Sequence, residues 1–141
     1  MSNFKKSVYL AGAMSYFYNK NTPQLAKEWR DYSKSFLEKH NINCFNPCDE
    51  PKICSTFPKG GLMKQNYYYL KNCDIVLVNL DMIQDSPGTM WELSMAWAQK
   101  KLVVAFGDSH WLEREHLISL IDVKFENNDE ALNYINNMFY V

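Results

Sequence analysis

Short apolar runs alternate with longer amphipathic stretches along this chain. The clearest run is 74–80, Asp-Ile-Val-Leu-Val-Asn-Leu, and similar runs occupy 7–11 and 102–106. A nearly continuous apolar run of this length is typical of a strand that is buried on both faces. The pattern predicts two shorter strands at 42–46 and 123–125.

The stretches between the strands have helical periodicity. Leu25, Trp29 and Phe36 lie at helical spacing after the start signal Thr22-Pro23, which predicts a helix from about Thr22 to Glu38. Further helices are predicted at 62–71, after the turn 84–89, near 112–120, and from a cap at Asp129 to about Met138.

Strands that alternate with helices predict a parallel sheet with helices on both faces. We therefore expect a single α/β domain over residues 1–141, a three-layer sandwich with about five parallel strands. Hydrophobic residues make up 47% of the chain, enough for a core that needs no disulfide or metal. The segment 47–61 lacks periodicity and is expected to act as a lid.

The charges are nearly balanced and evenly spread. Fifteen basic and sixteen acidic side chains give a formal net charge of −1, without a basic stripe or an acidic tail. A nucleic-acid or membrane-surface partner is therefore not expected. The first apolar run is too short for a signal sequence, and no run reaches the length of a membrane span, so a cytoplasmic location is expected.

Four cysteines, Cys44, Cys48, Cys54 and Cys73, are expected to be reduced thiols in that location. His40 and the first three of them lie close enough in sequence to raise the possibility of a zinc site. Their spacing lacks the tight CxxC of such sites, and Cys44 falls in a predicted strand. Inert thiols are the favoured interpretation, and we expect no metal or other cofactor.

Ligands of open parallel sheets bind beyond the carboxyl ends of the strands. Three segments, 12–17, 81–92 and 107–110, are predicted to converge there. In the second segment, Ser86-Pro87-Gly88-Thr89 opens a helix whose free backbone N–H groups could hold an anion. Gly88 would allow a ligand to approach the backbone closely. Most such turns are nevertheless plain helix starts.

Glu92 lies near the start of the same helix, where the helix dipole favours its ionised form. An ionised carboxylate beside a bound sugar can attack the anomeric carbon and form a covalent intermediate. Judged from spacing alone, an acidic residue near a helix start more often only stabilises the helix, through its dipole or as a cap, and has no catalytic role. A catalytic role for Glu92 therefore needs support from elsewhere in the sequence.

That support comes from four segments that together resemble the nucleoside 2-deoxyribosyltransferase family. They are Tyr-Leu-Ala-Gly at 9–12, Asn-Cys-Asp-Ile-Val at 72–76, Gly-Thr-Met-Trp-Glu-Leu at 88–93 and Lys-Leu-Val-Val at 101–104. The Gly-Thr-x-x-Glu-Leu piece is moderately specific, and its combination with the first strand carries the resemblance. The similarity covers most of the chain and is weakest in 47–61 and after Gly107.

The resemblance implies a flavodoxin-like, Rossmann-like fold and an N-glycosidase or deoxyribosyltransferase-like enzyme with Glu92 as the nucleophile. The substrate would be a nucleoside 5′-monophosphate or a nucleoside. Water would resolve the glycosyl-enzyme in a hydrolase, and a second base would do so in a transferase. The resemblance also implies that the Tyr9 hydroxyl orients Glu92, although Tyr9 alone could be a core aromatic with its hydroxyl at the sheet edge.

One departure from the family concerns its usual acid, an Asp, which corresponds to Asn66 here. An amide has no readily lost proton and cannot serve as a general acid. Asp81 or Asp85 could take over this role, or the base could leave without strong protonation. The remaining alternative is a catalytically silent module that binds or senses nucleotides.

A second departure concerns Ser86, which stands where true transferases tend to carry Asp. A Ser there resembles the related deoxynucleoside 5′-monophosphate N-hydrolases, in which it helps to hold the phosphate. Ala13 and Ser15 stand where those hydrolases often have Ser and Arg, so part of their phosphate site is missing. The choices between nucleotide and nucleoside, and between hydrolysis and transfer, therefore stay open.

Several residues around these segments are expected to bind the substrate: Gly12, Met14, Ser15, Tyr16, Phe17, Ser86, Gly88, Thr89 and Trp91. Of the aromatic ones, Tyr16 and Phe17 are predicted to lie in a loop and favour ligand contact. The run Tyr67-Tyr68-Tyr69 cannot face inward as a whole from one helix, so at least one of these rings should be exposed. An exposed aromatic favours a homodimer or a higher homo-oligomer.

Overall fold

The computed structural model describes residues 6–47, 61–109 and 114–139. In these residues a parallel sheet is formed by five strands: β1 (Ser7–Gly12), β2 (Asn43–Phe45), β3 (Ile75–Asn79), β4 (Leu102–Phe106) and β5 (Val123–Phe125). Their order is β2-β1-β3-β4-β5, which is the order of flavodoxin-like folds. The predicted α/β fold with a parallel sheet is confirmed.

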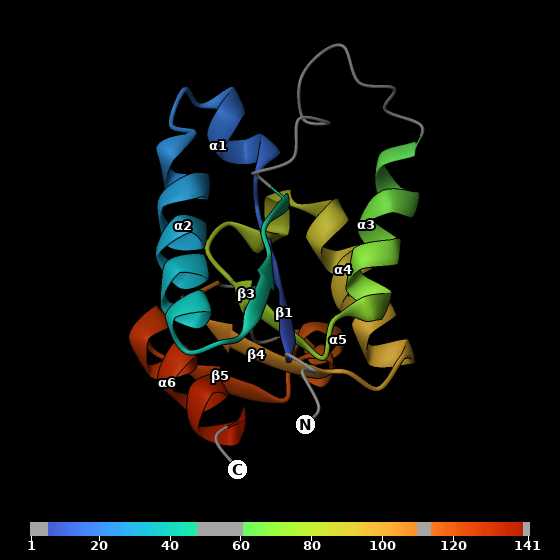
Figure 1. Cartoon of the computed structure of the whole chain (residues 1–141). Helices are drawn as coiled ribbons and strands as arrows, with labels where there is room; N and C mark the ends of the chain where they lie inside the picture. The colour runs from blue at the N-terminus through green and yellow to red at the C-terminus, as the bar shows by residue number, and fades with distance from the viewer. Residues whose placement is uncertain (1–5, 48–60, 110–113, 140–141) are drawn as a thin grey trace.

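Helices cover both faces of this sheet, which makes three layers. They are α1 (Ser15–Asn19), α2 (Gln24–Lys39), α3 (Leu62–Asn72), α4 (Pro87–Ala98), α5 (Glu115–Leu120) and α6 (Asn128–Phe139), together with the 3-10 turn η4 (Ile83–Asp85). Figure 1 shows α2 and α6 on one side of the sheet and α3 and α4 on the other.

Each face of the sheet has its own hydrophobic core, because successive residues of a strand point to opposite sides. Tyr9 and Ala11 of β1 pack with residues of α3 and α4. Val8 and Leu10 of the same strand pack with residues of α2 and α6. All four side chains are at most 1% exposed. The strand is therefore buried on both faces, as its apolar sequence predicts.

The register of the strands aligns their carboxyl ends. Gly12, the last residue of β1, pairs with Asn79 at the end of β3, and Asn79 pairs with Phe106 at the end of β4. The segments that follow these three strands therefore emerge at one edge of the sheet, as expected for an open parallel sheet with a site at its carboxyl edge.

The segment after β1 differs from the prediction. Tyr16 and Phe17 were expected in a loop, but they lie in the short helix α1. Its turn is closed by a hydrogen bond from the Tyr18 N–H to the Met14 carbonyl, at 3.1 Å. A single helical turn has too few residues to show periodicity in the sequence.

The cap of α6 also differs from the prediction, because Asp129 does not provide it. The side-chain oxygen of Asn127 accepts a hydrogen bond from the Glu130 N–H at 3.0 Å, and its amide donates to the Glu130 carboxylate at 2.9 Å. Asn127 is therefore the N-cap of α6, two residues before the predicted position, and a bond between its amide and Glu130 supports the cap. Asp129 instead accepts a hydrogen bond from the Tyr32 hydroxyl of α2.

Most of the predicted lid, 47–61, lies outside the described residues, and so do Cys48 and Cys54. His40 is exposed after the end of α2, and Cys44 is partly buried in β2. No group of His, Cys, Asp and Glu in the described part of the chain could hold a metal ion. Within the same ranges, no helix combines the length and the apolar character that a membrane crossing requires.

The three consecutive tyrosines of α3 are divided between surface and core. Tyr68 is 63% exposed and Tyr67 is 36% exposed. Tyr69 is partly buried and stacks on Phe45, with ring centroids 3.9 Å apart. The prediction that at least one of the three faces solvent is confirmed, while the oligomer that it favoured stays a prediction.

Candidate active site

A tyrosine of β1 and a glutamate of α4 form the centre of the candidate site. The Tyr9 hydroxyl donates a hydrogen bond to Oε2 of Glu92. Helix α4 is held against the sheet by Thr89, Leu93 and Ala96, which are buried on its inner side. The structure thus brings together two residues that are 83 positions apart in the sequence.

Aromatic packing fixes the Tyr9 ring. It stacks on Phe45 of β2 with a centroid distance of 5.2 Å, and Phe45 stacks in turn on Tyr69 of α3. Such stacked pairs add rigidity beyond the apolar area that they bury. The position of the Tyr9 hydroxyl is therefore set by three elements of the fold.

Burial raises the pKa of Glu92 to about 7. The hydrogen bond from Tyr9 and the positive charge of Arg30 both lower this pKa, but burial is the larger effect. Burial therefore outweighs the helix dipole, which the sequence predicts to favour the ionised form of Glu92. Glu92 is the sixth residue of α4, in its second turn, whereas the dipole acts mainly within the first turn.

The pKa of Tyr9 is raised above its ordinary value, first by burial and then by the negative charge of Glu92 and the hydrogen bond to it. The phenol therefore stays protonated and remains a donor. A carboxyl group with a pKa near 7 and a fixed donor has a large ionised fraction at neutral pH. It can act either as a nucleophile or as a base.

The amino end of α4 is capped by Ser86. Its hydroxyl accepts from the Thr89 N–H at 3.4 Å and lies 2.6 Å from the Thr89 hydroxyl. Pro87 has no N–H, and the Met90 N–H bonds to the Ser86 carbonyl. The Gly88 N–H is therefore the first-turn donor left for a ligand, and a Cβ at Gly88 would meet open space.

Asn66 lies on α3 and is partly buried. Its side-chain oxygen is buried and has no hydrogen-bond partner. The ring of the adjacent Tyr67 lies 6.2 Å from that of Trp91, the residue before Glu92, so this part of α3 flanks α4 near Glu92. A buried acceptor without a donor is costly, and an N–H or O–H group of a ligand could satisfy it.

The two aspartates considered as alternative acids have different settings. Asp81 is exposed, accepts a hydrogen bond from the Asp108 N–H at 3.0 Å, and donates its own N–H to Asn79 at 3.0 Å. At Gly107, where φ is +90°, a Cβ would lie 2.7 Å from the Asp81 carboxylate. Asp81 thus ties together the ends of β3 and β4, whereas Asp85 is an exposed residue of η4.

A cavity of about 340 Å³ opens at this edge of the sheet. Its lining consists of Phe17, Leu25, Asn79, Asp81, Met82 and Asp108. Phe17 is only 8% exposed and packs with Ala13 and Ala26, so it is at once a wall of the cavity and a core residue. Tyr16 is partly buried and meets Phe17 edge-on at 5.3 Å.

The remaining predicted binding residues surround this edge. Met14 and Trp91 are partly buried, and Thr89 is buried in α4. Ser15 opens α1, but its side chain lies outside the described part of the chain. Gly12 has a packing reason to be glycine, because a Cβ there would lie 3.0 Å from the Trp29 ring of α2.

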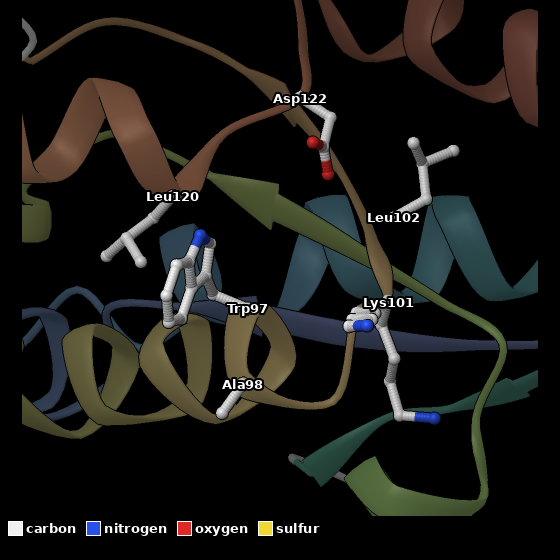
Figure 2. A pocket seen from close by; sticks show the side chains of 7 residues that line it. Trp97, Ala98, Lys101, Leu102, Leu120 and Asp122 are labelled. Carbon is white, nitrogen blue, oxygen red and sulfur yellow. The ribbon is translucent and has the colours of Figure 1, made fainter.

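A larger groove of about 480 Å³ lies at the opposite edge of the sheet, where β4 and β5 begin. Its lining consists of Trp97, Ala98, Lys100, Lys101, Leu102, Leu120 and Asp122 (Figure 2). The Lys101 ammonium is bonded to the Lys71 and Cys73 carbonyls, and the Asp122 carboxylate accepts from the Val103 N–H at 2.8 Å. The polar groups of this groove therefore serve the fold.

Sequence analysis missed one charged residue of the site, Arg30 of α2, which is only 1% exposed. Arginine is usually found at the protein surface, so an arginine in an amphipathic helix is expected on the exposed side of that helix. A signal was available, because Ala26, Arg30, Ser33 and Leu37 form the buried side of α2 at helical spacing.

Comparisons with known proteins agree with this architecture. The family model described as nucleoside 2-deoxyribosyltransferase matches residues 8–135. A search of curated proteins gives no match. Solved structures that are 15–20% identical to this chain in sequence are similar to it, and a likeness at this level shows the fold alone.

Several similar solved structures match nearly the whole chain, including the following three. A conserved protein from Enterococcus faecalis V583 has a TM-score of 0.72 at 15% identity, and the match covers 96% of this chain and 100% of that one. The 2-deoxyribosyltransferase from Bacillus psychrosaccharolyticus has a TM-score of 0.67 at 20% identity, covering 95% and 93%. The CMP N-glycosidase from Clostridium botulinum has a TM-score of 0.61 at 19% identity, covering 94% and 99%.

Proposed function

Because this chain belongs to the nucleoside 2-deoxyribosyltransferase family, we propose that it is an enzyme that cleaves the N-glycosidic bond of a nucleoside 5′-monophosphate or a nucleoside. The observation that carries the proposal is the hydrogen bond from Tyr9 of β1 to Glu92 of α4. The single domain of residues 1–141 would carry Tyr9, Glu92 and the other site residues described above.

In the first step, an ionised oxygen of Glu92 attacks the anomeric carbon of the sugar. The new bond joins this oxygen to the anomeric carbon, and the bond to the base nitrogen breaks, with its electron pair leaving on the base. Tyr9 donates to one carboxylate oxygen and leaves the other free to attack. The product of this step is a glycosyl ester of Glu92.

In the second step, the glycosyl ester is resolved at the same carbon. Water attacks in hydrolysis, its proton passes to the departed base or to solvent, and Glu92 is released as a carboxylate. A second base attacks through its nitrogen in transfer. Tyr9 would again stabilise the carboxylate as it leaves, because its raised pKa keeps it a donor.

Departure of the base is the step for which this chain is least equipped. Asn66 cannot protonate the base, and one oxygen of the exposed Asp81 carboxylate already accepts a hydrogen bond from the Asp108 N–H. The buried, unpartnered oxygen of Asn66 could instead accept a hydrogen bond from an N–H group of the base. We therefore favour a base that leaves with little protonation, with Asn66 holding it rather than activating it.

A phosphate on the substrate would lie near the amino end of α4. A Cβ on Gly88 would meet open space there, so a ligand could approach the backbone closely, and the Ser86 hydroxyl could turn from Thr89 towards a phosphate oxygen. One relative with a similar fold is a CMP N-glycosidase, while others are 2-deoxyribosyltransferases. The nucleotide is the preferred substrate on the strength of Ser86 alone.

The test is release of free base, measured by liquid chromatography, from a panel of nucleoside monophosphates and nucleosides, each with and without an acceptor base. Release from monophosphates without an acceptor supports a nucleotide hydrolase. New nucleosides that appear only with an acceptor support a transferase. No release from any member of the panel contradicts turnover of these substrates.

A second candidate function is a binding or sensor module without turnover. The observation in its favour is that Asn66 stands in place of an acid. Its buried side-chain oxygen has no hydrogen-bond donor and could accept one from a ligand. A thermal-shift panel with the same compounds separates the two functions. Strong stabilisation without base release supports the binder, whereas release at catalytic rates contradicts it.

A further inference from the structure

The charge and the contacts of Arg30 on α2 have no part in the steps above. This side chain is 1% exposed, the largest of the fully buried side chains in the described residues. Burying a guanidinium is costly unless its N–H groups are bonded and its charge is used. Its place at the carboxyl edge of the sheet indicates what that use is.

Two hydrogen bonds and one aromatic face hold the guanidinium. Nη1 donates to the Ala26 carbonyl at 2.7 Å, and Nη2 donates to the Gly12 carbonyl at 2.9 Å. The Trp29 ring centroid lies 4.7 Å from its central carbon. The planar fork of arginine can reach both carbonyls at once, whereas lysine has a single nitrogen.

The contact with Gly12 fixes the end of β1. Gly12 is the last residue of this strand, and Tyr9, the partner of Glu92, lies three residues before it. Because a peptide is planar, holding the Gly12 carbonyl also fixes the direction of the Ala13 N–H at the start of the next segment. A Cβ on Gly12 would lie 3.4 Å from Nη2, at ordinary van der Waals distance, so the guanidinium packs directly against this residue.

We propose that Arg30 is a positioning residue for the pair Tyr9 and Glu92. Through Gly12 it holds the end of the strand that carries Tyr9, and it brings a buried positive charge to that end of the strand. The catalytic part of this inference rests on the function proposed above. Consistent with it, Arg30 lowers the pKa of Glu92 and that of Tyr9 against the effect of burial.

Few other charges share this environment. Of the described titratable groups, Tyr9 on β1 and Arg30 on α2 act on the Glu92 carboxyl. Besides β1, the elements that pack most extensively against α4 are β4, α3, η4 and α5. Strand β4 has no titratable residue. The titratable residues of α3, η4 and α5 are Asp85, Lys64, Tyr67, Tyr68, Lys71, Glu115 and His116, which are exposed, and Tyr69, which stacks on Phe45.

The experiment measures the Glu92 carboxyl by ¹³C NMR titration of glutamate-labelled protein, with Glu92→Gln to assign its resonance. In Arg30→Met, the midpoint is expected to rise by about one pH unit, the scale of a lost opposite charge. In Arg30→Lys it should stay near the wild-type value. The control is Lys27→Met, which removes an exposed charge from the same helix and should change nothing.

Base release then tests the catalytic part. Arg30→Met is expected to lose about tenfold more activity at pH 6 than at pH 9, because the ionised fraction of Glu92 falls. Arg30→Lys should keep the wild-type pH profile with a lower kcat, because it loses one of the two carbonyl contacts. A folded Arg30→Met with an unchanged Glu92 titration overturns the proposal.

Two further outcomes are decisive. If Arg30→Met does not fold, the Arg30→Lys variant tests the proposal. A wild-type Glu92 titration midpoint together with a lower kcat supports the proposal, and an unchanged kcat contradicts it. If no substrate is turned over, the function proposed above fails, and the NMR titration alone decides whether Arg30 acts on Glu92.

Discussion

The Tyr9 hydroxyl donates its hydrogen bond to the Glu92 carboxylate, and burial raises the pKa of that carboxyl to about 7. The two residues come from the first strand and the fourth helix, and they meet because both lie on the α4 side of the sheet. The donor lowers the pKa of Glu92 while burial raises it. This balance determines how Glu92 should respond to pH and to mutation.

The first prediction concerns the pH dependence of base release. The nucleophile must be ionised, and half of Glu92 is ionised near pH 7. We expect kcat/KM to fall about tenfold for each pH unit below this value and to level off above it. An initial-rate series across this range measures it, and a rate that stays flat down to about pH 5 contradicts the assignment.

The second prediction concerns Tyr9→Phe. The variant loses a hydrogen bond to a charged group, worth about 1.5–3 kcal/mol, so kcat should fall roughly 10- to 150-fold. The Phe ring keeps the stacking on Phe45. The pKa of Glu92 should rise, because the Tyr9 hydrogen bond lowers it, and the acidic limb should move to higher pH.

Tyr32→Phe is the matched control, since its hydroxyl bonds to Asp129 on the surface. It should leave both the rate and the pH profile unchanged. If Tyr9→Phe behaves like this control, the hydroxyl has no role in catalysis.

The third prediction concerns stability. The folded-state pKa of Glu92 is raised from 4.5 to about 7, so the folded protein binds this proton more tightly than the unfolded chain. The free energy of unfolding therefore loses a contribution as pH rises between these values. Glu92→Gln removes this loss and should become more stable than wild type, by up to about 3 kcal/mol above pH 8.

Denaturant unfolding at several pH values measures this difference. It should shrink towards zero below about pH 4, where Glu92 is protonated in both the folded and the unfolded state. Glu28→Gln, at an exposed position of α2, should show no such trend. A stability difference for Glu92→Gln that does not change with pH would mean that burial does not shift this carboxyl.

The fourth prediction concerns Asn66→Asp. If departure of the base limits the rate, a carboxylic acid at this position should raise kcat by at least about tenfold, because general acids contribute 10²–10⁴-fold. Asn72→Asp, at an exposed position of the same helix, should leave kcat unchanged. Equal rates in Asn66→Asp and wild type contradict a limiting departure.

Much of this fold follows from the sequence. Apolar runs such as 74–80 predict strands buried on both faces, and their alternation with helices predicts the parallel order. The observed ends of the elements differ from the predicted ends by a few residues. The short helix α1 was not predicted, because a single helical turn shows no periodicity in the sequence. The cap at Asn127 was predictable, because an Asn followed by a Glu three residues later is typical of a helix start.

The candidate site was less predictable, because its contacts join distant parts of the chain. Residue spacing alone could not pair Tyr9 with Glu92, and the pairing came from the family resemblance. The structural role of Asp81 depends on the backbone at Gly107 and Asp108, which only the folded chain brings near. The burial of Arg30 was predictable only from its helical spacing with Ala26, Ser33 and Leu37, because a charged residue is by itself expected at the surface.

The measurement that tests the central claim most directly is base release by Glu92→Gln beside wild type, with the substrate that the panel identifies. The substitution keeps the shape of the side chain but removes the nucleophile, so the rate should fall at least about 10³-fold. Circular dichroism of the same samples controls for folding. A folded Glu92→Gln that releases base within about tenfold of the wild-type rate would contradict the account, because some other group would then break the bond.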